Sequence, residues 1–277
     1  MIKTYQSIPI DNLLYSCTSE VQRSTEKFLG IHAISCILEG ELHITTTKGI
    51  TVLNAGSIGL VERNQLIRSI KLPKSGGEFK AINIFLDVDI LRKYSIENNI
   101  QSEGNRHERD VYKLPNDAFI KAFFESIQPY FSQPQRMGPS MAELKTFEVI
   151  ELMLNASSYL KDILFDFSQL GKIDLEAFML QHYMFNVPID TLAKLTGRSR
   201  TGFKRDFQKV LGSTPYQWLK LKRLQQAYYL IKNKSIKPSA AYLEVGFENL
   251  SHFSLAFKQQ FGINPSALSN VKEDNVK

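Results

Sequence analysis

A cluster of hydrogen-bond donors lies on a short stretch near residue 200. Arg200 and Lys204 are four residues apart. Thr201 and Arg205 have the same spacing, so an α-helix would present all these side chains on one face. An arginine can form two parallel hydrogen bonds with guanine, a lysine can bind guanine or a phosphate, and the threonine methyl suits thymine. The cluster predicts contacts with double-stranded DNA; a solvated surface is the alternative.

The neighbouring residues predict the helix that would carry this cluster. Ser199 can cap its N-terminus with the side-chain hydroxyl. Phe203 and Phe207, at positions i and i+4, would anchor the opposite face in a core. Gly212 and then Pro215 would end the helix, because glycine favours the left-handed C-cap and proline cannot continue a helix.

The same pattern recurs 50 residues further along the chain. Its four marker residues reappear at that one offset as Phe253, Phe257, Gly262 and Pro265. Four matches at a single offset indicate an internal repeat, with Asn249 as the second helix cap. The residues expected to face DNA are Ser199, Arg200, Thr201, Lys204 and Arg205 in the first copy, and Asn249, Leu250, Ser251, His252, Ser254 and Lys258 in the second.

A shorter helix is expected ahead of each copy. Before the first, PIDTLAKLTG (188–197) predicts a helix that ends in a tight turn at Gly197. Before the second, SIKPSAAYLEVGF (235–247) follows the same plan, with its turn at Gly246. A short helix, a turn and a second, exposed helix together form a helix-turn-helix unit.

One long helix is expected to join the two units. The segment TPYQWLKLKRLQQAYYLIKN (214–233) has apolar residues at helical spacing. A stiff joining helix would let the two exposed helices enter successive major grooves, about 34 Å apart. Its inward side is predicted to consist of Trp218, Leu221, Leu224, Ala227 and Leu230.

Three ordered strings carry a family resemblance. They are LAKLTGRSRTGFKRDF (192–207), RLQQAYYLI (223–231) and VGFENLSHFSLAFKQQFGINP (245–265). On these strings, residues 173–269 resemble the paired helix-turn-helix domain of the AraC/XylS family of transcriptional regulators. The resemblance implies a sequence-specific regulator that binds promoters, contacts RNA polymerase and activates more often than it represses.

Two positions depart from the family pattern. Tyr242 stands where the family usually has a small residue, and Leu255 stands where it often has a basic or polar one. The second unit is therefore expected to bind DNA more weakly than the first.

The distribution of charge agrees with a separate basic domain. Residues 172–277 hold 16 Lys and Arg against 8 Asp and Glu, whereas residues 1–171 hold 18 against 20. The basic excess thus lies entirely in the C-terminal part, as expected of a module that binds a polyanion. We expect domains at 1–168 and 169–277, joined by a short linker around 167–172.

The N-terminal part predicts a different architecture. From Leu13 to about Asp87, short β-prone runs alternate with turn residues, and beyond Asp89 the periodicity becomes helical. The expected fold class is α+β: a small β-barrel or cupin-like domain with helices, followed by an all-α domain of two helix-turn-helix units. A helix after Pro139 is expected to bear an apolar stripe that packs on the β domain or forms a homodimer, namely Met141, Leu144, Phe147, Ile150 or Glu151, and Leu154.

Other chemistry has little support in the sequence. Cys17 and Cys36 form no CxxC pair, and the histidines at 32, 43 and 107 lack metal-ligand spacing. We expect no enzyme activity, no metal and no cofactor. No apolar run suits a signal peptide or a membrane helix, so a cytoplasmic protein is expected. The N-terminal domain could bind a small-molecule effector or serve only as a dimerisation or partner-protein module; a filled apolar interior would favour the module.

Overall fold

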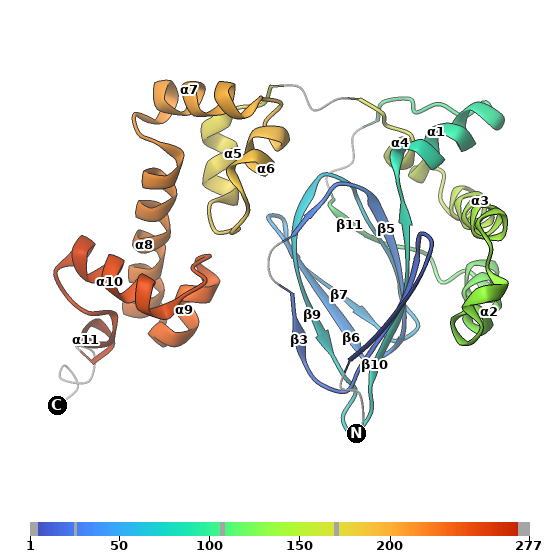
Figure 1. The fold of residues 1–277 in the computed structure, drawn as a ribbon, viewed down its shortest axis with the longest axis horizontal. Coiled ribbons are helices and arrows are strands. Elements are labelled where there is room, and N and C mark those ends of the chain that lie inside the picture. The colour runs from blue at the N-terminus through green and yellow to red at the C-terminus, as the bar shows by residue number, and fades with distance from the viewer. Residues whose placement is uncertain (1–4, 25–26, 106–108, 169–171, 271–277) are drawn as a thin grey trace. The chain divides into compact units, whose positions relative to one another are not determined.

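The chain divides into two compact units, Met1–Ser168 and Gln169–Lys277. The computed structural model describes residues 5–24, 27–105, 109–168 and 172–270. Strands, drawn from blue to green in Figure 1, lie together in the N-terminal unit with helices along one side, and the C-terminal unit, from yellow to red, is helical. The α+β class is therefore confirmed, while the expected linker lies partly outside the described residues.

The strands of the N-terminal unit lie in two antiparallel sheets. The first contains, in spatial order, β1 (Tyr5–Ile10), β2 (Leu13–Thr18), β10 (Phe79–Leu86), β5 (His32–Glu39), β8 (Ile58–Val61) and β11 (Val111–Lys113). The second contains β3 (Gln22–Arg23), β9 (Gln65–Leu72), β6 (Glu41–Thr46) and β7 (Gly49–Asn54), with β4 (Lys27–Leu29) also paired to β9. Among the described residues no strand pair joins the two sheets, so hydrogen bonds do not close them into a barrel.

Strand β5 shows how the N-terminal unit forms three layers. Its residues are buried on both faces, as expected for a strand covered on two sides. Ala33 and Ile37 belong to the apolar core between the two sheets. Ile34 and Cys36 belong to the larger core between the first sheet and the helices. The layer order is therefore helices, six-stranded sheet, five-stranded sheet.

Within the described part of the N-terminal unit, four α-helices and one 3-10 helix follow β10, and β11 lies between the first two of these helices. Helix α2 is capped by Asp117, whose side chain accepts hydrogen bonds from the amides of Phe119 and Ile120. This helix lies in the region beyond Asp89 where helical periodicity was expected. The elements are α1 (Val88–Glu97), α2 (Ala118–Ser132), η1 (Pro134–Arg136), α3 (Pro139–Ala156) and α4 (Leu160–Leu164).

The apolar stripe expected on α3 was partly wrong. Met141 and Leu144 are exposed, at 36% and 62%, and the buried face is turned by about one residue. Thr146 accounts for the shift: it is buried, donates to the carbonyl of Ala142 and accepts a hydrogen bond from Asn12. An apolar pattern cannot reveal a buried threonine. The residues that α3 buries are Ala142, Thr146, Val149, Ile150 and Met153.

The C-terminal unit contains seven helices within residues 172–270. The joining helix buries Trp218, Leu224 and Ala227 as expected, but Leu221 is 37% exposed and Ile231 takes an inward place. None of the described helices has the length and hydrophobicity needed to cross a lipid bilayer. The helices are α5 (Leu175–His182), α6 (Ile189–Leu195), α7 (Arg200–Leu211), α8 (Pro215–Lys234), α9 (Pro238–Glu244), α10 (Leu250–Phe261) and α11 (Pro265–Asn270).

Candidate nucleic-acid interface

Helix α7 begins and ends as its sequence predicts. The Ser199 hydroxyl accepts a hydrogen bond of 3.1 Å from the amide of Gly202, which satisfies a free donor of the first turn. Gly212 has φ 68°, the left-handed conformation that ends a helix without steric cost, and its amide donates to the carbonyl of Gln208. Phe203 and Phe207 are fully buried. One face of α7 is thus fixed in the core.

The opposite face of α7 is exposed and basic. Arg200, Thr201, Lys204 and Arg205 are all exposed. Arg200 lies 3.2 Å from the Asp190 carboxylate, but both side chains are at least 60% exposed. Such exposed ion pairs contribute little, so the guanidinium can exchange this partner for a phosphate or a base at small cost. The four expected side chains therefore share one accessible surface.

The turn before α7 contains an arginine with a structural role. The side chain of Arg198 is only 10% exposed; its Nε lies 3.1 Å from Asp206, and its Nη1 donates to the carbonyls of Ile173 and Thr196. The hydrogen bond from Arg198 holds the pKa of the Asp206 carboxyl below its usual value. Arg198 is thus engaged in holding the turn onto α7, which its position in a basic stretch did not reveal.

Helix α10 repeats the construction of α7. Asn249 accepts a hydrogen bond of 2.9 Å from the amide of His252, and Gly262 ends the helix with φ 76°. Phe253 and Phe257 are fully buried. Both helices span 12 residues, and their bounds differ by 50 positions throughout. The expected repeat is confirmed at the level of caps, length and buried aromatic pair.

The exposed face of α10 differs in chemistry from that of α7. Leu255, which corresponds to Arg205, is 58% exposed. Ser254, which corresponds to Lys204, is half-buried. The other expected residues of this face, all exposed, are Asn249, Leu250, Ser251, His252 and Lys258.

The two supporting helices end in the same turn geometry. Gly197 and Gly246 have φ of 65° and 85°, and the residue after each glycine donates its amide to a carbonyl five residues earlier. This is the Schellman arrangement, which satisfies the last carbonyls of a helix. The second turn is one residue longer, and Phe247 packs edge-to-face on Phe253 with ring centroids 5.2 Å apart. In α9 the small, fully buried residue is Ala241, and Tyr242 is half-buried beside it.

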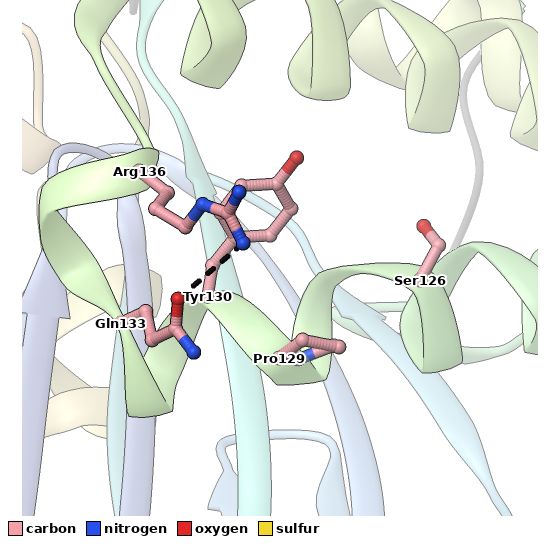
Figure 2. A pocket seen from close by; sticks show the side chains of 5 residues that line it. All are labelled: Ser126, Pro129, Tyr130, Gln133 and Arg136. Atoms are coloured by element: carbon pink, nitrogen blue, oxygen red, sulfur yellow. Dashed lines mark hydrogen bonds between the residues drawn. The ribbon is translucent and has the colours of Figure 1, made fainter.

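The N-terminal unit also has a surface pocket and isolated histidines. An open pocket of about 440 Å³ lies along α2 and η1. Figure 2 shows the side chains that line it, among them Arg136, which donates to Gln133. Nowhere in the described part of the chain do three metal-ligating residues gather. His32 is buried with its pKa lowered to about 3 by burial, and His43 pairs with Glu41 on the surface. The histidine at 107 lies outside the described residues.

Two exposed helices on matching helix-turn-helix scaffolds, joined by α8, define the class of DNA-binding proteins with paired helix-turn-helix units. Two family models match the chain: the helix-turn-helix domain over residues 192–270 and the ExsA N-terminal regulatory domain over residues 32–163. Together they match both units of the structure.

Individual relatives agree with these models. The HTH-type transcriptional regulator ExsA of Pseudomonas aeruginosa is 29% identical over 140 residues, 49% of this chain and 50% of ExsA. The virulence regulon transcriptional activator VirF of Yersinia enterocolitica is 29% identical over 92 residues, 33% of this chain and 34% of VirF. The chain thus spans about half the length, or less, of the curated relatives it matches. These comparisons identify an AraC-type helix-turn-helix domain over residues 192–270 and relate the chain to the transcriptional regulators ExsA and VirF.

Among solved structures, the fatty-acid-bound ToxT of Vibrio cholerae matches over 96% of both chains, with 13% identity and a TM-score of 0.41.

Proposed function

We propose that this protein regulates transcription by binding promoter DNA through both helix-turn-helix units, with α7 and α10 as recognition helices in successive major grooves. The observation that carries the proposal is the exposed basic face of α7, held outward by a capped helix and two buried phenylalanines. A helix placed in this way can present its side chains to base edges.

In the first unit, Arg205 and Lys204 are proposed to contact bases. The Arg205 side chain is 76% exposed, and its nearest acid is Asp206, at 3.5 Å. A guanidinium that is free to move can bind guanine through two parallel hydrogen bonds. Thr201 is proposed to offer its methyl group to thymine, and Arg200 and Ser199, at the helix start, are proposed to contact phosphates.

In the second unit, recognition is proposed to depend less on charge. Leu255 and Leu250 present apolar surface that suits thymine methyl groups, whereas Ser251, His252 and Ser254 supply neutral hydrogen-bonding groups. Lys258 and the Asn249 end of the helix are proposed to contact phosphates. We propose that this unit fixes the register of the protein on the adjacent groove.

For the N-terminal unit we propose a dimerisation or partner-protein module. The layer between its two sheets consists of buried apolar side chains, among them Ile37, Leu53 and Phe79, each fully buried. A filled apolar interior supports this role over that of a small-molecule sensor. The division at residue 168, with DNA binding assigned to residues 169–277, is part of the proposal.

Activation through RNA polymerase is proposed from the relatives. VirF is named a transcriptional activator, and the segment that VirF shares with this protein covers a third of this chain. A regulatory protein without catalytic activity agrees with these relatives, which are transcriptional regulators. The proposed site of action is the bacterial promoter, with the protein in the cytoplasm.

The test is selection of bound duplexes from random-sequence DNA by the full chain, followed by binding titrations at several salt concentrations. We expect one enriched motif with two half-sites about one helical turn apart. The residues expected to face DNA include four cations, Arg200, Lys204, Arg205 and Lys258. If all four lie against the DNA, the logarithm of affinity should fall with a slope of about 3 to 4 against the logarithm of salt concentration. No enriched motif, or a nearly flat salt response, would contradict the proposal.

A further inference from the structure

Arg223, on the joining helix α8, contacts both helix-turn-helix units. Its Nε donates to the carbonyl of Tyr183 at 2.7 Å, and its Nη2 donates to the carbonyl of Phe185 at 2.9 Å. Its Nη1 donates to the carbonyl of Gly246 at 3.0 Å and to Asn186 Oδ1 at 3.3 Å. One half-buried guanidinium thus binds the segment before α6 and the turn before α10 together.

The geometry of this contact requires an arginine. A guanidinium is planar and carries five N–H donors in a fixed fork, so it can bind acceptors from different segments at fixed angles. A lysine offers a single point of attachment on a flexible stem. The carbonyls of Tyr183 and Phe185 follow the end of α5, where backbone acceptors lack helical partners and favour a cation.

Gly246 shows how closely the two segments approach. A Cβ atom at this position would lie 2.5 Å from the carbonyl oxygen of Met184 and 3.2 Å from Arg223 Cζ. A side chain there would push the segments apart, in addition to opposing the φ of 85°. A second link joins the same segments, because Asn186 Nδ2 donates to Glu248 at 2.6 Å.

We propose that Arg223 is a positioning residue that fixes the angle and spacing between the two recognition helices, and thereby sets the half-site spacing that the protein accepts. The bound segments lie immediately ahead of α6 and α10, whose first residues are Ile189 and Leu250, so the clamp acts on the start of one helix in each unit. The clamp is defined as Arg223 together with the Asn186–Glu248 link. This inference rests on the proposed DNA binding.

The first experiment measures spacing preference. The duplex selected by the wild-type protein is compared with duplexes that carry one or two extra base pairs between the half-sites. A rigid pair of helices should lose about tenfold in affinity for each added base pair, because one recognition helix is turned off its groove. Arg223→Gln should lose less than about threefold per insertion while binding the optimal duplex more weakly.

Two further variants keep this test decisive. Lys234→Gln removes the same charge from an exposed position of α8 and should keep the wild-type spacing preference. Glu248→Ala removes the acceptor of the outer link, at an exposed residue, and should show an intermediate preference even if Arg223→Gln does not fold. A wild-type spacing preference in both clamp variants would overturn the inference, and so would the same loss of preference in Lys234→Gln.

The second experiment needs no DNA. Spin labels attached through Lys209→Cys and Gln260→Cys, both exposed positions, report the distance between α7 and α10 in the full chain. The distance distribution should be narrow in the wild-type background and should broaden in Arg223→Gln and Glu248→Ala. An unchanged distribution in both variants would refute the clamp, whereas failure to select any DNA motif would refute only the proposed function.

Discussion

The two helix-turn-helix units share a scaffold and differ in the surface that the scaffold presents. Each recognition helix has 12 residues, a polar N-cap, a left-handed glycine at its end and two fully buried phenylalanines. On the exposed face, Lys204 and Arg205 of the first unit correspond to Ser254 and Leu255 of the second. The two recognition helices therefore have the same residue type, phenylalanine, at two buried positions, and different residue types at their exposed positions.

The two units also differ in the turn that precedes each recognition helix. In the first unit Arg198 binds Asp206 of its own recognition helix. The residue at the same position of the second unit is Glu248, which binds Asn186 from the first unit. The first turn is thus stabilised within its own unit, and the second depends on its neighbour. This difference suggests that the first unit can hold its recognition helix unaided.

The largest expected effect on DNA affinity comes from reversing charge on the exposed face of α7, compared with adding a negative charge to the exposed face of α10. Arg205→Glu should weaken binding to the selected duplex by about 100-fold or more, because a base contact is lost and a negative charge faces the groove. Leu255→Glu should cost about tenfold, mainly through repulsion of phosphates. Fluorescence anisotropy with the labelled duplex measures both, and Lys234→Glu on α8 controls for the change in charge. Equal losses of affinity in the two variants would contradict the proposed difference between the two units in DNA binding.

A gain of charge should partly equalise the units. Leu255→Arg places a guanidinium at the position that corresponds to Arg205, and we expect affinity to rise about three- to tenfold with a salt slope steeper by about 1. Discrimination at the second half-site should decrease if Leu255 contacts thymine methyl groups. Binding titrations on duplexes with single base changes measure this. Unchanged affinity and salt slope would show that Leu255 lies away from DNA.

The shared scaffold predicts equal effects at the two caps. Ser199→Ala and Asn249→Ala each remove one hydrogen bond to the first turn of a recognition helix. Each should lower the free energy of unfolding by about 1 kcal/mol. Urea denaturation of the full chain measures the loss, with Ser239→Ala, an exposed serine of α9, as the control. A large difference between the two caps would mean that the scaffolds are less alike than their geometry indicates.

Much of this arrangement could be predicted from residue types and spacing. Capping residues, the paired phenylalanines and the left-handed glycines are local signals, so the recognition helices and their bounds follow from the sequence. The strands from β5 to β8 follow from their alternation with turn residues. Strand β1 was not expected, since its residues are mostly exposed, and neither was the three-residue β11.

The remainder depends on contacts between distant residues. Arg198 and Arg223 add to the basic count in the same way as Arg205, yet they bind carbonyl groups 25 and 40 residues away. Nothing in their local sequence separates an arginine that holds two segments together from one that faces solvent. The orientation of α3 was missed for a related reason, because Asn12 hydrogen-bonds to Thr146 across 134 residues.

The smallest expected effect tests whether the first turn is self-contained. Because Arg198 holds the pKa of Asp206 below 3.8, ionised Asp206 stabilises the folded state at pH values above the unfolded pKa. This stabilisation is lost as the pH falls below 3.8 through the folded pKa. Asp206→Asn should therefore melt at a lower temperature than the wild-type protein at pH 7, and the gap should shrink towards pH 3. Asp190→Asn, which alters only the exposed pair with Arg200, should show little change at either pH. If the difference in melting temperature between Asp206→Asn and the wild-type protein did not depend on pH, the carboxylate charge would not stabilise the turn. In the second unit the position that corresponds to Asp206 holds the buried Ala256, and the two turns would then differ in packing alone.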